Sequence, residues 1–474
     1  MELNYKGSGF ANIESKDREC HFFLNESEGG ILLRVIVNDP FASSLLLPDE
    51  ISQLKVELSN GVKLLLIDAF RSEGVISNIS SKESIYSYSA KYLISDFSKF
   101  ENVTSGLNCV LFEASGILGW GGISAYQIDD NYGVKQNSDN KITLLKNQDY
   151  EINYLVTGTM LPVHKSHLFS DNIELNQRSV IEIKYTTSHP IDNYFELFEK
   201  IKYLIELNTI EKIAINNIQG YSNTEYTLLN DDKKIPSVLK IISPIIKSNK
   251  VEKNYFGMYK LRVFTLENLM ENNSIEIYFN NFEKLKPIIE LYIEMLYLKN
   301  ISSVRLFLNV VQALETYHSR FKSNKITEFR KRVDSISKDY RDNTKEFLLA
   351  NSKGFITLES RIADLVLAEF QIYFKTGQIG KNEFPNVIAK TRNYYIHYDE
   401  KLKLENKILT EEELSIYNLS LLILLDYYIY SELGFKDSQE LMKKLKYRWG
   451  DVENILSQQN AFKNRFNSNI EGNK

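Results

Sequence analysis

The fold is decided first by residues 410–434, which read TEEELSIYNLSLLILLDYYIYSELG. This stretch opens with a capping box, in which the Thr410 hydroxyl can accept from a free backbone N–H and Glu413 can reach back. Gly434 supplies a stop signal at the other end. The centre is apolar on nearly every side. We therefore predict a helix that lies either in the middle of a helical bundle or on a dimer surface.

Working towards the N-terminus from this helix, the helical period extends back to about residue 280. The predicted helices cover residues 282–298, 304–321, 327–338 and 356–375. The C-terminal part of the chain is therefore predicted to be an all-α domain.

The first half of the chain has the pattern of strands instead. Asn60-Gly61 lies between the apolar runs 54–58 and 62–67, which predicts a hairpin whose two turn residues have positive φ. Further strands are predicted at residues 31–37, at 180–185 as a half-buried alternating strand, and from 212–215 to about 274–279. A helix over about 192–207 and a tight β turn at Trp120 complete the expectations for this half, with ligand binding by an exposed Trp120 as the alternative.

These patterns predict an α+β protein of more than one domain. Its 474 residues are more than a single hydrophobic core normally accommodates. We place a β-rich domain at residues 1–279 and an all-α helical bundle at 280–474.

The composition restricts the function classes. The net charge of −5 means that a nucleic-acid site would have to be a local patch. Two cysteines give no disulfide framework, which favours a reducing compartment. The N-terminus shows no signal core, and the apolar run 421–425 is far shorter than the ~20 residues that span a bilayer. We therefore expect a cytoplasmic protein with no membrane partner.

The stretch that carries chemistry is Lys390-Thr391-Arg392-Asn393-Tyr394-Tyr395-Ile396-His397-Tyr398-Asp399. Chance yields on the order of half a match to Arg-x4–6-His in this chain, and roughly one in twenty once Asn must follow the Arg. Histidine can move a proton near neutral pH, and arginine can stabilise charge on a phosphorane. RNA carries its own nucleophile, the 2′-hydroxyl, so this pair suits RNA cleavage without a metal or cofactor.

The spacing leaves open how the two residues would meet. On a helix, Asn393 and His397 share a face, but Arg392 lies about 140° from His397. The arginine stem could reach round, the helix could end before His397, or a second subunit could contribute, which we favour. The competing interpretation is a hydrogen-bonded helix surface beside Tyr394, Tyr395 and Tyr398.

The motif resembles the signature of HEPN domains, in particular the ApeA-like branch. Residues 308–318 are similar to the early helix of that branch, the helix that ends at residues 431–435 is similar to its closing helix, and the β-rich half resembles the N-terminal domain found in ApeA. The resemblance implies a dimeric, metal-independent endoribonuclease of abortive anti-phage defence. It also implies that His397 acts as general acid and base and that Arg392 binds the phosphate and stabilises the transition state. Asn393 would orient either this pair or the scissile phosphate, and Glu315 would support the site.

One position departs from the family pattern. Some HEPN toxins carry a modified tyrosine two residues after the histidine, where this chain has Asp399, which argues against that form of control.

Two hypotheses follow. In the first, a β-rich sensor half responds to a phage component and releases a ribonuclease that acts on RNA. In the second, the chain is a binding module without enzymatic activity, whose HEPN half only dimerises or holds RNA. Two other features stay open: a basic cluster at residues 320–332 could follow an RNA backbone or be a solvated surface, and His164 with His167 is expected to lie in a loop rather than to bind a metal.

Overall fold

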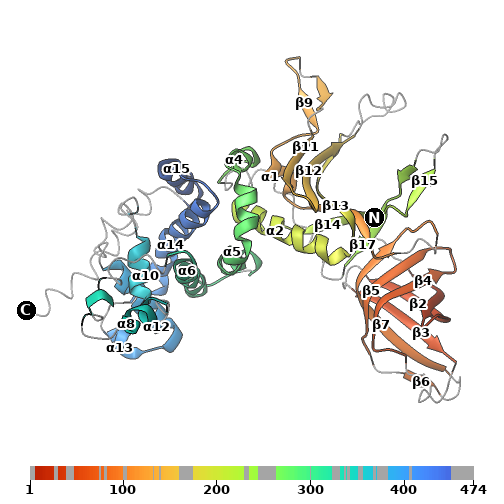
Figure 1. The fold of residues 1–474 in the computed structure, drawn as a ribbon, viewed down its shortest axis with the longest axis horizontal. Coiled ribbons are helices and arrows are strands. Elements are labelled where there is room, and N and C mark those ends of the chain that lie inside the picture. Colours follow the sequence, from red (N-terminus) through yellow and green to blue (C-terminus); the bar gives the residue numbers. More distant parts are fainter. Residues whose placement is uncertain are drawn as a thin grey trace, which may run out of the picture. The chain divides into compact units, whose positions relative to one another are not determined.

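The computed structural model describes residues 6–449, except for the segments 26–29, 39–46, 74–75, 79–82, 100–103, 132, 138–139, 160–174, 229–233, 244–262, 299, 323–330, 332, 336–337, 339–341, 351–355, 367–369, 371–382 and 405–407. The chain divides into two compact units. Residues 1–205 and 213–258 form a β-rich unit, and residues 206–212 and 259–474 form a helical unit. Figure 1 shows the strands of the β-rich unit and the helices of the helical unit.

Six antiparallel strands of the β-rich unit close into a barrel, in the order β7, β3, β2, β1, β4, β5 and back to β7. Closure removes the free edges that an open sheet would expose. The strands are β1 (Lys6–Ile13), β2 (Lys16–Asn25), β3 (Gly30–Val37), β4 (Glu50–Leu58), β5 (Lys63–Arg71) and β7 (Glu83–Ser95), and β6 (Ile76–Asn78) pairs with β7. The predicted strand at 31–37 is therefore confirmed as β3, whose alternate side chains fill the barrel core.

The predicted hairpin is present as β4 and β5, but its turn differs from the expectation. Only Gly61 has positive φ, at 84°, so the expectation for Asn60 was wrong. The Gly61 N–H donates to the Leu58 carbonyl and the Leu58 N–H to the Val62 carbonyl. This is a three-residue loop, in which a single left-handed residue suffices.

A second, open sheet continues from β7 through β17, β14, β8, β13 and β12 to β11, all antiparallel. Helix α2 (Ile191–Thr209), predicted at 192–207, packs on one face, where Phe198 stacks on Phe112 of β8 at 4.2 Å. Residues 179–183 of β13 are all buried, so the half-buried alternation predicted there was wrong: this strand lies inside the sheet. The remaining elements are β8 (Leu107–Ala114), α1 (Ile117–Gly121), β9 (Tyr126–Ile128), β10 (Val134–Gln136), β11 (Lys141–Lys146), β12 (Tyr150–Gly158), β13 (Gln177–His189), β14 (Ile215–Tyr221), β15 (Tyr226–Leu228), β16 (Lys234–Pro236) and β17 (Leu239–Ile242).

Trp120 corrects another expectation. It lies in the short helix α1 rather than in a tight β turn, and its side chain is fully buried, with its ring edge-on to Tyr154. It therefore belongs to the core and is no ligand platform.

The helical unit begins before the predicted boundary at residue 280. Its elements are α4 (Leu266–Glu271), α5 (Ser274–Tyr297), α6 (Ser303–Tyr317), the π-helix η3 (His318–Lys322), α8 (Asp342–Ala350), α10 (Leu358–Leu365), α12 (Phe384–His397), α13 (Glu400–Leu404), α14 (Glu411–Glu432) and α15 (Ser438–Trp449). Residues 274–279 are thus helical and not the last strand. Their alternating Ile275, Ile277 and Phe279 imitate a strand, but Ile275, Tyr278 and Phe282 are the buried ones, at helical spacing.

The other predicted helices agree in part with the structure. Those at 282–298 and 304–321 are confirmed as α5 and as α6 with η3. The helix predicted at 356–375 is confirmed over α10, and most of its other residues lie outside the described part of the chain. Most of the helix predicted at 327–338 also lies outside the described residues.

Helix α14 has the predicted ends. Thr410 and Glu413 form the capping box, and Gly434 adopts φ 97°. The N–H groups of Gly434 and Phe435 donate to the carbonyls of Ser431 and Tyr430, the pattern of a Schellman motif. Within the described part of the chain this is the one helix long and apolar enough to cross a membrane, but 78% of its apolar window is buried, as in a core helix. Of the two predicted placements, the structure supports the middle of the bundle.

Candidate active site

Helix α12 carries the Arg-Asn-x3-His motif and is fixed to the chain just before α14. The Thr391 hydroxyl is buried; it donates to the Val387 carbonyl at 2.7 Å and accepts from the Leu409 N–H at 3.0 Å. The Tyr395 hydroxyl donates to the Leu409 carbonyl at 3.2 Å. The residue before Arg392 therefore anchors the helix, while the motif side chains lie on its more exposed sides.

The helix extends as far as His397. Tyr398 follows in the left-handed conformation, at φ 52°, and its N–H still donates to the Tyr394 carbonyl. A helix that ends before His397 is thereby excluded as a way to bring the histidine round to Arg392.

Arg392 lies close to two of the other predicted site residues, Asn393 and Glu315. Its Nη1 donates to Oδ1 of Asn393 at 3.2 Å, and its Nη2 lies 3.9 Å from Oε2 of Glu315 on α6. About a third of its side chain is exposed. The structure thus brings Arg392, Asn393 and Glu315 together.

His397 is apart from this group within one chain. Its side chain is exposed at the last turn of α12, and among the described residues no hydrogen bond or ion pair joins it to Arg392. Neither side chain is buried away from solvent, so both remain accessible to a large ligand.

A pocket of about 520 Å³ opens beside Arg392. Its lining residues are Gln312, Glu315, Thr316, Ser319, Arg320, Arg361 and Arg392. Ser319 and Arg320 belong to η3, where α6 widens from an α- to a π-helical turn, a feature that is frequent at functional sites. The pocket volume lies within the range of small-molecule sites, so a nucleotide phosphate can enter.

Glu315 lies between two guanidinium groups. Its Oε1 is 3.9 Å from Nε of Arg361 on α10, and its Oε2 is equally far from Nη2 of Arg392. Both separations exceed the 2.7–2.9 Å of a charge-assisted hydrogen bond, roughly the geometry of a loose ion pair. The carboxylate balances part of the two positive charges without closing tightly on either.

Arg361 was not singled out from the sequence. Its side chain is buried, with 3% exposed, and burial lowers its pKa while the charge of Glu315 opposes that effect. Its Nη1 lies 3.3 Å from Nδ1 of His318. Because a guanidinium can only donate, Nδ1 must accept, and Nε2 therefore carries the proton that His318 donates to Oδ2 of Asp364 at 3.0 Å.

This chain of contacts fixes Arg361 in one orientation, facing the pocket. The signal in the sequence was an arginine on the apolar stripe of α10, whose Ile362 and Leu365 are buried, since arginine is almost never fully buried unless it is paired. Its partner His318 could not be read from the sequence, because the two residues lie 43 positions apart.

Of the other sequence features, only part of the basic cluster can be placed, because most of its residues lie outside the described part of the chain. Arg320 lines the pocket and donates to the carbonyls of Glu283 and Lys284, at 2.8 and 3.1 Å. Most of the basic cluster at 320–332, as well as His164 and His167, lies outside the described residues. Within the described part of the chain, no group of three or more His, Cys, Asp or Glu is placed to hold a metal ion.

The chain has a β-rich unit followed by a helical unit, in which an Arg-Asn-x3-His helix borders an arginine-lined pocket. These features are those of HEPN-domain proteins with a β-rich N-terminal region. Comparison with known families agrees: the Apea-like HEPN family matches residues 308–439, and ApeA N-terminal domain 1 matches residues 13–287. The chain belongs to the ApeA family, which confirms the resemblance seen in the sequence. No curated protein and no solved structure matches it.

Membership of this family implies a role in defence against phage. HEPN domains are generally ribonucleases.

Proposed function

We propose that the protein is a metal-independent endoribonuclease of abortive anti-phage defence. The observation that supports this most is the pocket in which Arg392, on the motif helix, and the buried Arg361 flank one carboxylate. Two guanidiniums that line one pocket form a site for an oxyanion, and the phosphodiester of RNA is the oxyanion that carries its own nucleophile.

The proposed reaction needs no group beyond these side chains and the substrate. The 2′-hydroxyl loses its proton to a base, its oxygen bonds to phosphorus, the bond from phosphorus to the 5′-oxygen breaks, and that oxygen takes up a proton. His397 supplies the proton transfers, Arg392 and Arg361 stabilise the charge on the phosphorane, and Asn393 and Glu315 orient the arginines. The products are a 2′,3′-cyclic phosphate and a 5′-hydroxyl.

The proposal includes a homodimer. His397 is exposed and does not line the pocket of its own chain, so the imidazole that acts at Arg392 comes from a second copy in this scheme. In the same scheme RNA in the cytoplasm is the substrate, and the β-rich unit responds to a phage component.

Induced expression in bacteria tests the proposal. We expect growth arrest and new RNA ends with the wild-type chain, and neither with His397→Ala or Arg392→Ala. Matched controls are His21→Ala and Arg305→Ala, two exposed residues outside the pocket, which should act like wild type. Purified protein should cut RNA in the presence of a chelator and leave cyclic phosphate ends, whereas a requirement for Mg²⁺ would contradict the mechanism.

The separation of His397 from the pocket favours one alternative, a module that binds RNA or a phage component without cutting it. Protection from phage that survives both His397→Ala and Arg392→Ala would leave this alternative as the function.

A further inference from the structure

The β-rich unit contains a second pocket, of about 560 Å³, on the sheet face opposite to α2. Helix α2 packs on Phe112 of β8, whereas Cys109 and Leu111 of the same strand line the pocket. Because successive side chains of a strand point to opposite faces, the pocket occupies the face that α2 leaves uncovered. The described residues that line it are Asn108, Cys109, Leu111, Leu155, Thr157, Arg178, Val180, Glu182, Lys184, Tyr185, Gln219, Tyr221, Ser222, Asn223 and Pro236.

The register of the strands explains how these side chains converge. Arg178, Val180, Glu182 and Lys184 alternate along β13 and so share one face. Glu182 lies opposite Leu111 of β8, and Leu111 lies opposite Gln219 of β14. Lys184, Cys109 and Tyr221 form the next row across the same strands.

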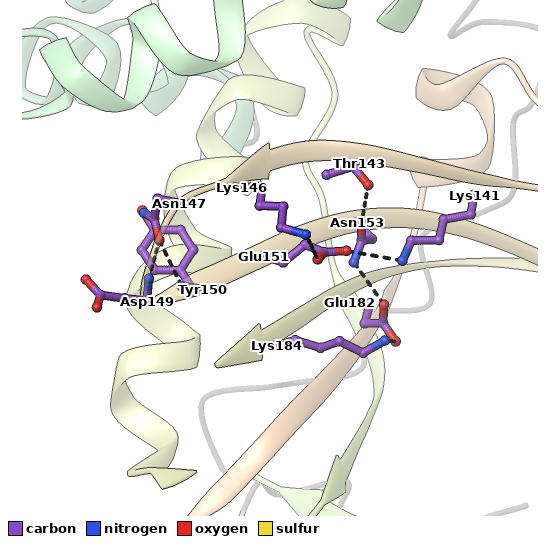
Figure 2. Close-up of polar contacts among 10 residues, drawn as sticks. All are labelled: Lys141, Thr143, Lys146, Asn147, Asp149, Tyr150, Glu151, Asn153, Glu182 and Lys184. Carbon is purple, nitrogen blue, oxygen red and sulfur yellow. Dashed lines mark hydrogen bonds and ion pairs between the residues drawn. The ribbon is translucent and has the colours of Figure 1, made fainter. Parts of the chain in front are cut away.

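A neutral ion pair forms one end of the pocket. Glu182 is buried, with 8% exposed; its Oε2 accepts from Nδ2 of Asn153 at 3.0 Å, and its Oε1 lies 2.8 Å from Nζ of Lys184. Figure 2 shows this pair on β13 beside Asn153 of β12, whose Oδ1 in turn accepts from Thr143. The carboxylate is therefore already satisfied by the protein and has little attraction left for a cationic ligand.

Arg178 differs from Lys184, because its charge is not balanced. Its Nε donates to Oγ1 of Thr157 at 3.3 Å, and no acidic side chain in the described part of the chain pairs with it. Counting these three charged residues, the pocket has one excess positive charge. That charge lies beside an apolar surface made by Leu111, Leu155 and Val180.

Two neutral polar groups complete the pocket. The side chains of Gln219 and Tyr221 make no hydrogen bond to another described residue. Burial raises the pKa of Tyr221, and the neighbouring Cys109 adds to the effect while Arg178 opposes it, so the phenol keeps its proton as a donor. An apolar pocket with a few convergent polar groups is the usual form of a small-molecule site.

We propose that this pocket binds a small organic anion, a carboxylate or a phosphate attached to a flat apolar body. The anionic group pairs with Arg178, the body lies on Leu111, Leu155 and Val180, and Gln219 and Tyr221 donate to the polar edge of the ligand. The site is independent of the ribonuclease chemistry proposed above and would give the β-rich unit a chemical input of its own.

Titration calorimetry on the full chain tests the charge preference first. The probes are benzoate, benzylamine and adenosine monophosphate, with inorganic phosphate as the anion that lacks a body. We expect saturable binding of benzoate or the nucleotide, at least about tenfold tighter than benzylamine or phosphate, since one charge-assisted hydrogen bond contributes that much. Which of the two binds distinguishes a carboxylate from a phosphate site.

Variants then locate the binding. Arg178→Gln should weaken it about tenfold or more, while Arg34→Gln, at an exposed arginine of β3, should leave it unchanged. Glu182→Gln should tighten it, because Lys184 then loses its partner, and this gain of binding cannot come from misfolding. Equal binding of benzylamine and benzoate, no saturable binding of either anion, or full binding in Arg178→Gln would each overturn the proposal.

Discussion

At the scale of single residues, the pocket beside Arg392 depends on how Arg361 is held. The bond from its Nη1 to His318 sets the ring tautomer, and Asp364 accepts from the other side of the same ring. An arginine held in this way loses little side-chain entropy when it binds a phosphate, because its orientation is fixed before the ligand arrives.

We therefore expect Arg361→Gln to lower the rate of RNA cleavage about 100- to 1,000-fold, the usual effect of removing one donor to a transition-state oxyanion. Arg361→Lys should recover only part of the rate, since an ammonium cannot keep both the His318 contact and the phosphate contact. Single-turnover cleavage of a short RNA measures both effects. Arg305→Gln, an exposed residue of α6 outside the pocket, is the control. Wild-type cleavage by a folded Arg361→Gln protein would exclude this role.

The site was predictable from the sequence only where its residues lie close together in the chain. Arg392, Asn393 and His397 fall within six residues, and the helix that carries them was expected to put Arg392 and His397 on different sides. Glu315 was found through the resemblance, and the structure places it next to Arg392. Arg361, His318 and Asp364 depend on the packing of α10 against the end of α6, which no local pattern encodes.

At the scale of elements, helices with clear end signals were the most predictable. The capping box and Gly434 defined α14 at both ends because both signals act through local backbone hydrogen bonds. Residues 274–279 show the opposite case. The alternation of apolar and polar residues fits a strand. The residues form a helix because Ile275 and Tyr278, at helical spacing, are buried inside the helical unit.

The edge of the open sheet carries a pH-dependent contact. Glu151 of β12 lies between Lys141 and Lys146 of β11, at 3.2 and 3.3 Å (Figure 2). A hydrogen bond from Asn153, together with these two lysines and against the effect of burial, lowers the pKa of Glu151 to about 2 from its ordinary 4.5. A carboxyl whose pKa is lower in the folded state stabilises the fold above its unfolded pKa and loses that contribution as the pH falls towards the folded value.

Glu151→Gln should accordingly destabilise the protein at pH 6 and make progressively less difference as the pH falls from about 4.5 to about 2. Urea unfolding followed by circular dichroism at several pH values measures the difference in the free energy of unfolding between the two proteins. Asp130→Asn, at an exposed residue outside this contact, is the matched control. A difference that stays constant over the whole range would show that the charge of Glu151 contributes nothing to it.

At the scale of the whole molecule, the order of a β-rich and a helical part could be predicted because the hydrophobic period changes along the chain. Which residues belong to each unit could not be predicted in this way. Residues 206–212 belong to the helical unit, where Nη2 of Arg448 donates to the carbonyls of Leu207 and Asn208 at 2.6 and 2.9 Å. Arg448 also pairs with the buried Asp426. The two bonds to Leu207 and Asn208 join residues more than 200 positions apart, which sequence periodicity cannot reveal.

The proposed dimer is tested by mixing two inactive chains. In the scheme above, each site takes Arg392 from one copy and His397 from the other. A dimer of one Arg392→Ala chain and one His397→Ala chain then has one site with both residues intact and one with neither. Random pairing of equal amounts makes half of the dimers mixed, so about a quarter of the wild-type cleavage rate should return. Each variant alone should stay inactive, and a mixture with no gain over the separate variants would mean that the site is not shared in this way.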